Sequence, residues 1–210
     1  MIKKHWKLLL ITSLIILLPI AVGVVFWDEL PEEIPTTWNT EGEVVGWSSR
    51  AFGVFGMPAI LLGFQWLCML GTLSDPKRKN HSAKVLQMIL WFIPVLSCLL
   101  CTLTYAAALG KEVKMEMVMP VFVGLVLAIV GNYLPKCKQN YTIGIKIPWT
   151  LNSEENWNRT HRFASGIWVV GGLVIMATGF FGGFWIFAGV VAVMVLAPML
   201  YSYILYRKGI

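Results

Sequence analysis

The sequence predicts an all-α integral membrane protein with six transmembrane helices. Of its 210 residues, 57% are hydrophobic and 13% are charged, whereas a soluble domain carries about 25% charged residues. About 20 consecutive apolar residues are enough to cross the hydrocarbon core of a bilayer. Six such runs lack Asp, Glu, Lys, Arg and His, and they cover residues 8–27, 51–73, 85–109, 117–134, 164–181 and 184–206.

Basic residues predict the orientation of these spans. Fourteen of the 17 Lys and Arg residues lie next to the termini or in the second and fourth loops; only Arg50, Lys111 and Lys114 lie in other loops. The positive-inside rule therefore places both termini in the cytoplasm. The net charge of +6 thus reflects orientation and contact with membrane lipids, because direct nucleic-acid binding would need a basic cluster on a folded soluble module.

The first outside loop, residues 28–50, contains the segment LPEEIPTTWNTEGEVVGWSSR and most of the acidic residues. Prolines extend the residues before them, and Asn and Gly favour turns, so we expect an ordered loop. Two interpretations remain open: a structured cap on the span ends, or an acidic surface that meets a cationic peptide or ion. The candidate residues of this loop are Pro35, Trp38, Asn39, Glu41, Gly42 and Glu43.

The inside loop, residues 135–163, contains NYTIGIKIPWTLNSEENWNRTHR. The alternation in YTIGIKIP is typical of a strand that ends at Pro148. Asn152 is then a candidate N-cap, with Glu155 placed as in a capping box and paired with Arg159 at i,i+4. We therefore expect an extended Ile-faced segment followed by an interfacial helix.

Trp157, His161 and Ala164 recur at helical spacing, so one stripe should lead from an amphipathic interfacial helix into the fifth span. His161 has no carboxylate or Cys at ligand spacing, which favours a hydrogen-bonded histidine over a metal ligand, base or pH switch. The candidate residues for contact with a partner or with lipid are Asn140, Gly144, Lys146, Pro148, Trp149, Thr150, Trp157, Arg159, His161 and Arg162.

Small residues and prolines in the spans predict how the helices pack. Gly124 and Ala128 and the Gly pair at 171–172 suit close helix contacts, and Gly182-Gly183 should form a tight hairpin. Pro in a membrane helix kinks it, and neighbours satisfy the freed carbonyl. Broken helices also occur at transporter substrate sites, which is the alternative interpretation. The four cysteines predict neither a disulfide nor a metal site, and no cofactor is expected.

Two segments resemble the SdpI-like family. The outer-loop segment is similar to the family's amino-terminal module, and NYTIGIKIPWTLNSEENWNRTHRFASG is similar to its second signature nearly position for position. The resemblance implies modules at 1–74 and 75–210 in a multi-pass protein of the bacterial plasma membrane. It also implies immunity to a secreted peptide toxin, and signalling by holding a transcriptional repressor at the membrane. The family often has His, Asp and Arg where this chain has Thr37, Val45 and Lys146.

Other functional classes fit the sequence less well. A transporter or channel, the alternative function, usually needs strongly polar groups within its spans, and the amides in or near the spans are Gln65, Gln87 and Asn132. A lipid-cleaving enzyme needs a nucleophile with a base, or a metal cluster. The acidic residues of the outer loop and His161 are predicted on opposite sides of the membrane, so we expect no catalysis. The sequence does not indicate an oligomeric state.

Overall fold

The computed structural model describes residues 2–210, with side chains from Trp6 onward. Six of its helices are long and apolar enough to cross a membrane, as the sequence predicted. Short helical turns at Phe52–Gly56, Arg78–Asn80 and Leu134–Lys136 complete the order. The main elements are α1 (Ile2–Val25), β1 (Glu33–Trp38), β2 (Val44–Ser49), α2 (Met57–Leu73), α3 (Ala83–Ala108), α4 (Met115–Tyr133), α5 (Pro148–Asn152), α6 (Glu154–Phe181) and α7 (Phe184–Arg207).

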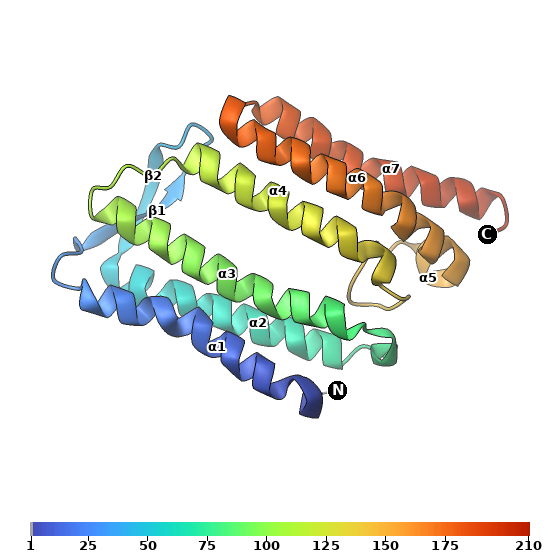
Figure 1. The fold of residues 1–210 in the computed structure, drawn as a ribbon, viewed down its shortest axis with the longest axis horizontal. Helices are drawn as coiled ribbons and strands as arrows, with labels where there is room; N and C mark the ends of the chain where they lie inside the picture. Colours follow the sequence, from blue (N-terminus) through green and yellow to red (C-terminus); the bar gives the residue numbers. More distant parts are fainter. Residues whose placement is uncertain (1) are drawn as a thin grey trace. The chain divides into compact units, whose positions relative to one another are not determined.

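The described chain forms two compact units. The first unit comprises Met1–Leu73 and Leu86–Lys114, and so holds α1, α2, most of α3 and the two strands. The second unit comprises Ser74–Val85 and Met115–Ile210, and so holds α4 to α7 and the segment between α2 and α3. Figure 1 gives the element labels.

In the first unit, α3 supplies donors to the backbone of α1 near Pro19. Proline has no N–H, so it leaves the carbonyl of Ile15, four residues earlier, without its helical donor. The thiol of Cys98 donates to this carbonyl at 3.7 Å, and the hydroxyl of Ser97 donates to the carbonyl of Ile16 at 2.9 Å. The expectation that a neighbour satisfies the freed carbonyls is confirmed for this proline.

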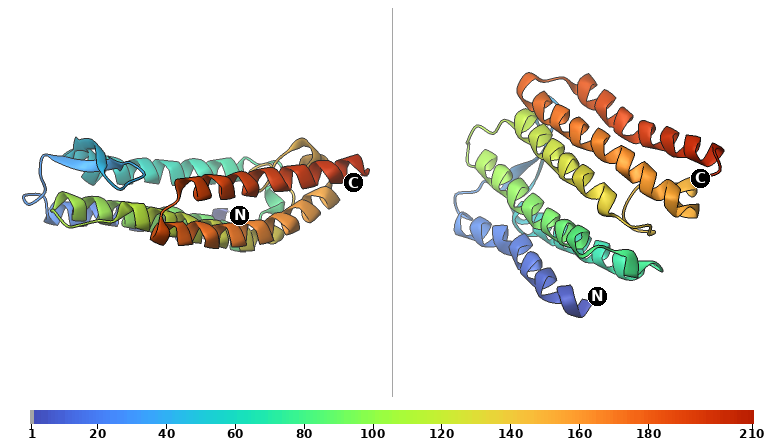
Figure 2. Two further views of the ribbon diagram at one scale, coloured as in Figure 1. Left: turned by 90° about the horizontal axis from the view of Figure 1, so that it is seen from above. Right: turned by 45° about the vertical axis from the view of Figure 1, so that its right-hand side comes forward.

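In the second unit, α6 lies between α4 and α7, as Figure 1 and the right-hand view of Figure 2 show. The predicted small residues lie at the α4–α6 contact: a Cβ added at Gly172 would lie 2.5 Å from the carbonyl oxygen of Gly124 and 2.6 Å from the backbone N of Ala128. The two backbones approach this closely because neither Gly carries a side chain. Gly182 and Gly183 connect α6 to α7 directly, as predicted.

The outer loop contains an antiparallel hairpin, which the sequence analysis expected only as an ordered turn. β1 pairs with β2 in the register Glu33↔Ser49, Pro35↔Trp47 and Trp38↔Val44, with irregularities around Thr37. The hairpin follows α1 and leads through the turn at Phe52–Gly56 into α2. It is the only sheet in the described part of the chain.

The inside loop differs from the sequence prediction in two ways. The segment 141–147 is not a strand: it bends at 141–144 and has no partner strand. Asn152 is not an N-cap, because it is the last residue of α5; the hydroxyl of Ser153 accepts the backbone N–H of Asn156 at 3.1 Å and caps α6 instead. The predicted interfacial helix and the fifth span are one continuous helix, α6.

Candidate functional site

The tip of the outer hairpin is organised by Asn39. Its side-chain oxygen accepts the backbone N–H groups of Glu41 at 3.0 Å and Glu43 at 2.9 Å, and its amide donates to the Glu43 carboxylate at 3.0 Å. Gly42 lies inside the same turn. Asn39 and Gly42 therefore shape the tip, whereas the side chains of Glu41 and Glu43 remain exposed to solvent.

The two strands of the hairpin differ in the exposure of their apolar side chains. Pro35 and Ile34 are buried and Trp38 is partly buried. On β2, Val45 is 60% exposed and Trp47 is 58% exposed. The hairpin therefore has exposed apolar side chains on β2 in addition to the exposed carboxylates at its tip.

Arg50 attaches the base of the hairpin to the end of α1. Its guanidinium donates to the carbonyls of Trp27 at 2.7 Å and Leu30 at 2.9 Å, and it lies 4.4 Å from the centroid of a Trp27 ring. From the sequence alone, Arg50 is only a basic residue in a loop with an acidic bias. Its presence on a side with few basic residues was the available signal for this role.

In the loop 135–163, Asn140 shapes the segment that follows α4. It is 2% exposed. Its side-chain oxygen accepts the N–H groups of Thr142 at 2.8 Å and Ile143 at 2.6 Å, and its amide donates to the carbonyls of Lys138 at 2.8 Å and Ile143 at 3.0 Å. These bonds bend the chain back on itself, and they explain why alternating isoleucines do not form a strand here.

Gly144, Trp157 and His161 form one packed group. The rings of Trp157 and His161 stack with centroids 4.1 Å apart. His161 Nε2 accepts the N–H of Ile145 at 2.9 Å, and its Nδ1 lies 2.8 Å from the carbonyl oxygen of Trp157. This pattern requires a neutral ring protonated on Nδ1, and it confirms the expected hydrogen-bonded histidine. A Cβ at Gly144, whose φ is +124°, would lie 2.5 Å from His161 Nε2.

Thr150 fixes the remainder of the loop. It is fully buried. Its hydroxyl accepts the N–H of Ile147 at 3.1 Å and lies 2.7 Å from the carbonyl oxygen of Ile145. Trp149 packs against α7, with ring centroids 5.1 Å from Tyr203 and 6.1 Å from Tyr206.

The remaining predicted residues of the inner loop are exposed. Pro148 begins α5, and Lys146 donates to the carbonyl of Thr142 at 3.0 Å. Arg159 is paired with Glu155 at 2.5 Å, as predicted, and Arg162 lies one turn further along α6. The predicted set therefore divides into buried or partly buried residues that shape the loop and residues that are exposed at its surface.

Asp75, which the sequence analysis missed, connects this loop to the segment between α2 and α3. Its side chain is buried completely. The carboxylate accepts the Thr142 hydroxyl at 2.6 Å, the N–H of Tyr141 at 3.0 Å and the N–H of Lys77 at 2.7 Å. The available signal was a single acidic residue in an otherwise basic loop.

The charge of Asp75 is stabilised where it lies. Burial opposes ionisation, but the hydrogen bonds from Thr142, Lys77 and Tyr141, together with His81, outweigh burial and hold the pKa of this carboxyl below its ordinary value. His81 Nε2 lies 3.2 Å from the Asp75 carboxylate. A carboxylate that accepts several N–H and O–H bonds is expected to remain ionised at neutral pH.

Gln139 strengthens the same connection. Its side chain accepts from Lys77 Nζ at 2.5 Å and donates to the carbonyls of Thr150 at 2.8 Å and Leu151 at 2.9 Å. Asn80 donates to the backbone carbonyl of Gln139 at 2.7 Å. The segment between α2 and α3 and the loop after α4 thus form one hydrogen-bonded layer at one end of the second unit.

A second group missed from the sequence fastens α6 to α7. Asn156 is fully buried. Its amide donates to the carbonyl of Ser202 at 3.0 Å, and its side-chain oxygen accepts the hydroxyls of Ser202 at 2.6 Å and Thr160 at 3.1 Å. The part of the chain that the structure describes contains no group of three His, Cys, Asp or Glu side chains placed to hold a metal ion.

Two regions of the chain match known family models, and nearly the whole chain matches a known protein. Residues 136–202 match the model of the SdpI/YfhL protein family, and residues 14–62 match a domain of unknown function, DUF1648. Immunity protein SdpI of Bacillus subtilis (strain 168) is 32% identical over 208 residues, which cover 95% of this chain and 96% of the relative. The chain belongs to the SdpI family.

The two matched regions of this SdpI-family protein contain the two segments described above. The first includes the whole hairpin, and the second begins before the bent inner loop and extends into α7. The family relationship and the six apolar helices identify a multi-pass protein of the bacterial plasma membrane. No solved structure matches the chain significantly.

Proposed function

We propose that this protein is a membrane immunity and signalling protein that protects the cell against a secreted antimicrobial peptide toxin. One observation carries the proposal: the similarity to Immunity protein SdpI extends over 95% of this chain and 96% of the relative. Similarity over both full lengths includes the outer hairpin and the inner loop together. The modules expected from the sequence, 1–74 and 75–210, are then proposed to divide the work between toxin contact and signalling.

The outer hairpin is the proposed site of toxin contact. All six carboxylates of residues 28–43 are exposed, whereas Arg50, the single basic residue of the loop 28–50, is engaged with backbone carbonyls. Val45 and Trp47 add exposed apolar surface on the same hairpin. A cationic amphipathic peptide complements this combination, because charge speeds the encounter and the apolar contact slows dissociation.

The inner loop is the proposed site of signalling, where a transcriptional repressor would be held at the membrane. The buried Asp75 and its hydrogen bond with Thr142 hold the layer rigid enough to present side chains in a fixed arrangement. Lys146 and Tyr141 are exposed on that layer. A rigid surface binds a partner with less loss of conformational entropy than a mobile loop would.

Paired substitutions separate the toxin contact from a general effect of charge. Glu41→Gln with Glu43→Gln should lower survival of a toxin-sensitive strain that expresses this chain. Glu112→Gln with Glu116→Gln is the matched control, because both residues are exposed and are predicted on the same side. Equal protection by both pairs at equal membrane abundance would remove the hairpin from the proposal.

The transport alternative has one supporting observation. Gln65 is 2% exposed and donates to Thr12 Oγ1 at 3.0 Å, so a polar contact lies within the apolar helices of the first unit. The cavity beside it measures only about 10 Å³, which is room for about one water molecule. The other two amides, Gln87 and Asn132, are on exposed helix surfaces. Immunity is therefore the better-supported proposal.

A further inference from the structure

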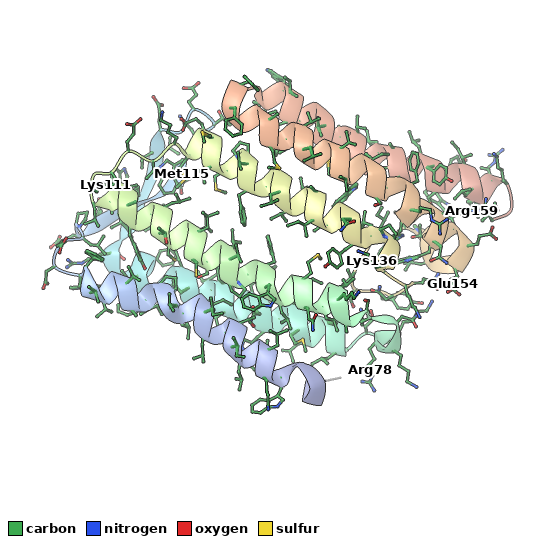
Figure 3. The ribbon with its side chains drawn as sticks, in the orientation of Figure 1. Arg78, Lys111, Met115, Lys136, Glu154 and Arg159 are labelled. Atoms are coloured by element: carbon green, nitrogen blue, oxygen red, sulfur yellow. The ribbon has the colours of Figure 1, made fainter. Side chains whose placement is uncertain are left out.

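An open groove of about 720 Å³ lies between the first turns of α6 and the last turns of α7. All of its lining residues belong to the second unit. Figure 3 labels Glu154 and Arg159 at this end of α6. Its charged and aromatic lining residues are Glu154, Glu155, Arg159, Arg162, Phe163 and Tyr201.

The chemistry of the groove changes in a fixed order along the exposed face of α6. The carboxylates of Glu154 and Glu155 come first, the guanidinium groups of Arg159 and Arg162 follow, and Phe163 comes last. Beyond Phe163 the helix is apolar. Since the apolar part crosses the membrane, the carboxylates lie furthest from the hydrocarbon and Phe163 lies closest to it.

The far end of the groove is a flat aromatic surface. The rings of Phe163 and Tyr201 stack with centroids 4.3 Å apart and planes 19° apart. Aromatic rings with this placement are common at the level of lipid headgroups and glycerol backbones. The opposite face of α6 in the same turns carries Trp157 and His161, which are buried, so the groove face is the one that meets lipid.

The charges of the groove are only partly paired with one another. Glu155 and Arg159 form an ion pair at 2.5 Å, and both side chains are at least half exposed. Glu154 and Arg162 have no ion-pair partner among the residues that the structure describes. One carboxylate on the water side and one guanidinium on the membrane side are therefore available to a ligand.

We propose that this groove binds the headgroup of a zwitterionic phospholipid that carries a primary ammonium group, such as phosphatidylethanolamine. The ammonium group meets the carboxylates of Glu154 and Glu155, and the phosphate meets Arg159 and Arg162. The glycerol and upper acyl carbons lie against Phe163 and Tyr201. From water to hydrocarbon, the order of charges in the groove matches the order of groups in such a lipid. This proposal does not depend on a role of the protein in toxin immunity.

Two other lipid classes fit this arrangement less well. An anionic lipid such as phosphatidylglycerol offers no cation to the two carboxylates and would meet repulsion from them. Phosphatidylcholine has a cation, but its methylated ammonium has no N–H to donate to a carboxylate. Charge-assisted hydrogen bonds are stronger than contact with an equal charge alone, so the primary ammonium should be preferred.

The test is competitive lipid retention by the purified full-length chain. The protein is equilibrated in detergent with equal amounts of phosphatidylethanolamine, phosphatidylcholine and phosphatidylglycerol, and bound lipids are counted by native mass spectrometry. The proposal predicts retention of phosphatidylethanolamine about fivefold above either competitor, which corresponds to about 1 kcal/mol. Equal retention of all three lipids, or preferential retention of phosphatidylglycerol, would overturn it.

Variants assign the preference to the groove. Arg162→Gln should lower retention of phosphatidylethanolamine about fivefold, as expected for loss of one interfacial charge pair. Glu154→Gln with Glu155→Gln should abolish the preference over phosphatidylcholine. Arg78→Gln is the matched control, because Arg78 is an exposed basic residue of the same unit outside the groove. If Arg78→Gln lowers retention as much as Arg162→Gln does, the site assignment is wrong.

Discussion

Replacing Asp75 by Asn should loosen the inner layer of the second unit. The carboxylate accepts three hydrogen bonds, and its side chain is fully buried. Asparagine has nearly the same shape, but its NH2 group would face donors from Thr142 and Tyr141. Hydrogen bonds to a charged group contribute about 1.5–3 kcal/mol each. Because the remaining oxygen keeps part of this interaction, we expect a loss of about 2–4 kcal/mol in the free energy of unfolding.

The assay is thermal unfolding of the purified protein in detergent at several pH values. The folded-state pKa of Asp75 lies below its ordinary value of 3.8. Its contribution is therefore complete above pH 3.8 and is lost as the pH falls through the folded-state pKa. The wild-type midpoint should fall in this acidic range, and the Asp75→Asn midpoint should start lower and change less there. Identical midpoints and pH profiles for both proteins would show that the Asp75 carboxylate does not stabilise this layer.

Three further substitutions test other contacts. Gly172→Leu should lower the free energy of unfolding by more than the usual overpacking cost of about 1–3 kcal/mol. Gly166→Leu, where a Cβ meets nothing within 4 Å, should leave it nearly unchanged; equal shifts of the thermal midpoint in the two variants would contradict the close helix contact. Gly144→Ala should speed proteolysis of the inner loop, because a Cβ there meets His161 and the φ of +124° costs about 1–3 kcal/mol without Gly; an unchanged cleavage rate would argue against this packing. Arg50→Lys should loosen the hairpin by about 1–2 kcal/mol, measured by proteolysis of the outer loop, and a hairpin of unchanged resistance would show that the two carbonyl contacts are dispensable.

The membrane architecture was predictable because its causes are local in the sequence. The length of an uncharged run, which decides whether it can cross the bilayer, can be counted in the sequence. The basic residues that set the orientation lie directly beside such runs. The contact between Gly172 and Gly124 was also predictable in kind, because small residues mark close helix packing. The partner of each Gly, however, depends on which helices are neighbours, and only the structure supplies that.

The inner layer was less predictable because its contacts are distant in the sequence. Asp75 meets Thr142 across 67 residues, and no local pattern links the two. The alternating isoleucines of 143–147 suggested a strand, but a strand needs a partner, and the side chain of Asn140 takes the backbone N–H groups of the loop instead. Ser153 and Asn152 are both good N-cap residues, so the exact start of α6 depended on where α5 ended.

A survival measurement tests the proposed protection against a secreted peptide toxin. A strain that lacks its own immunity protein is exposed to graded concentrations of a cationic membrane-active peptide toxin, with and without expression of this chain. We expect expression to raise the toxin concentration needed for killing, and Glu41→Gln with Glu43→Gln to lower it again at equal membrane abundance. If the killing curves with and without the chain coincide across a panel of such peptides, the protein does not confer immunity to them.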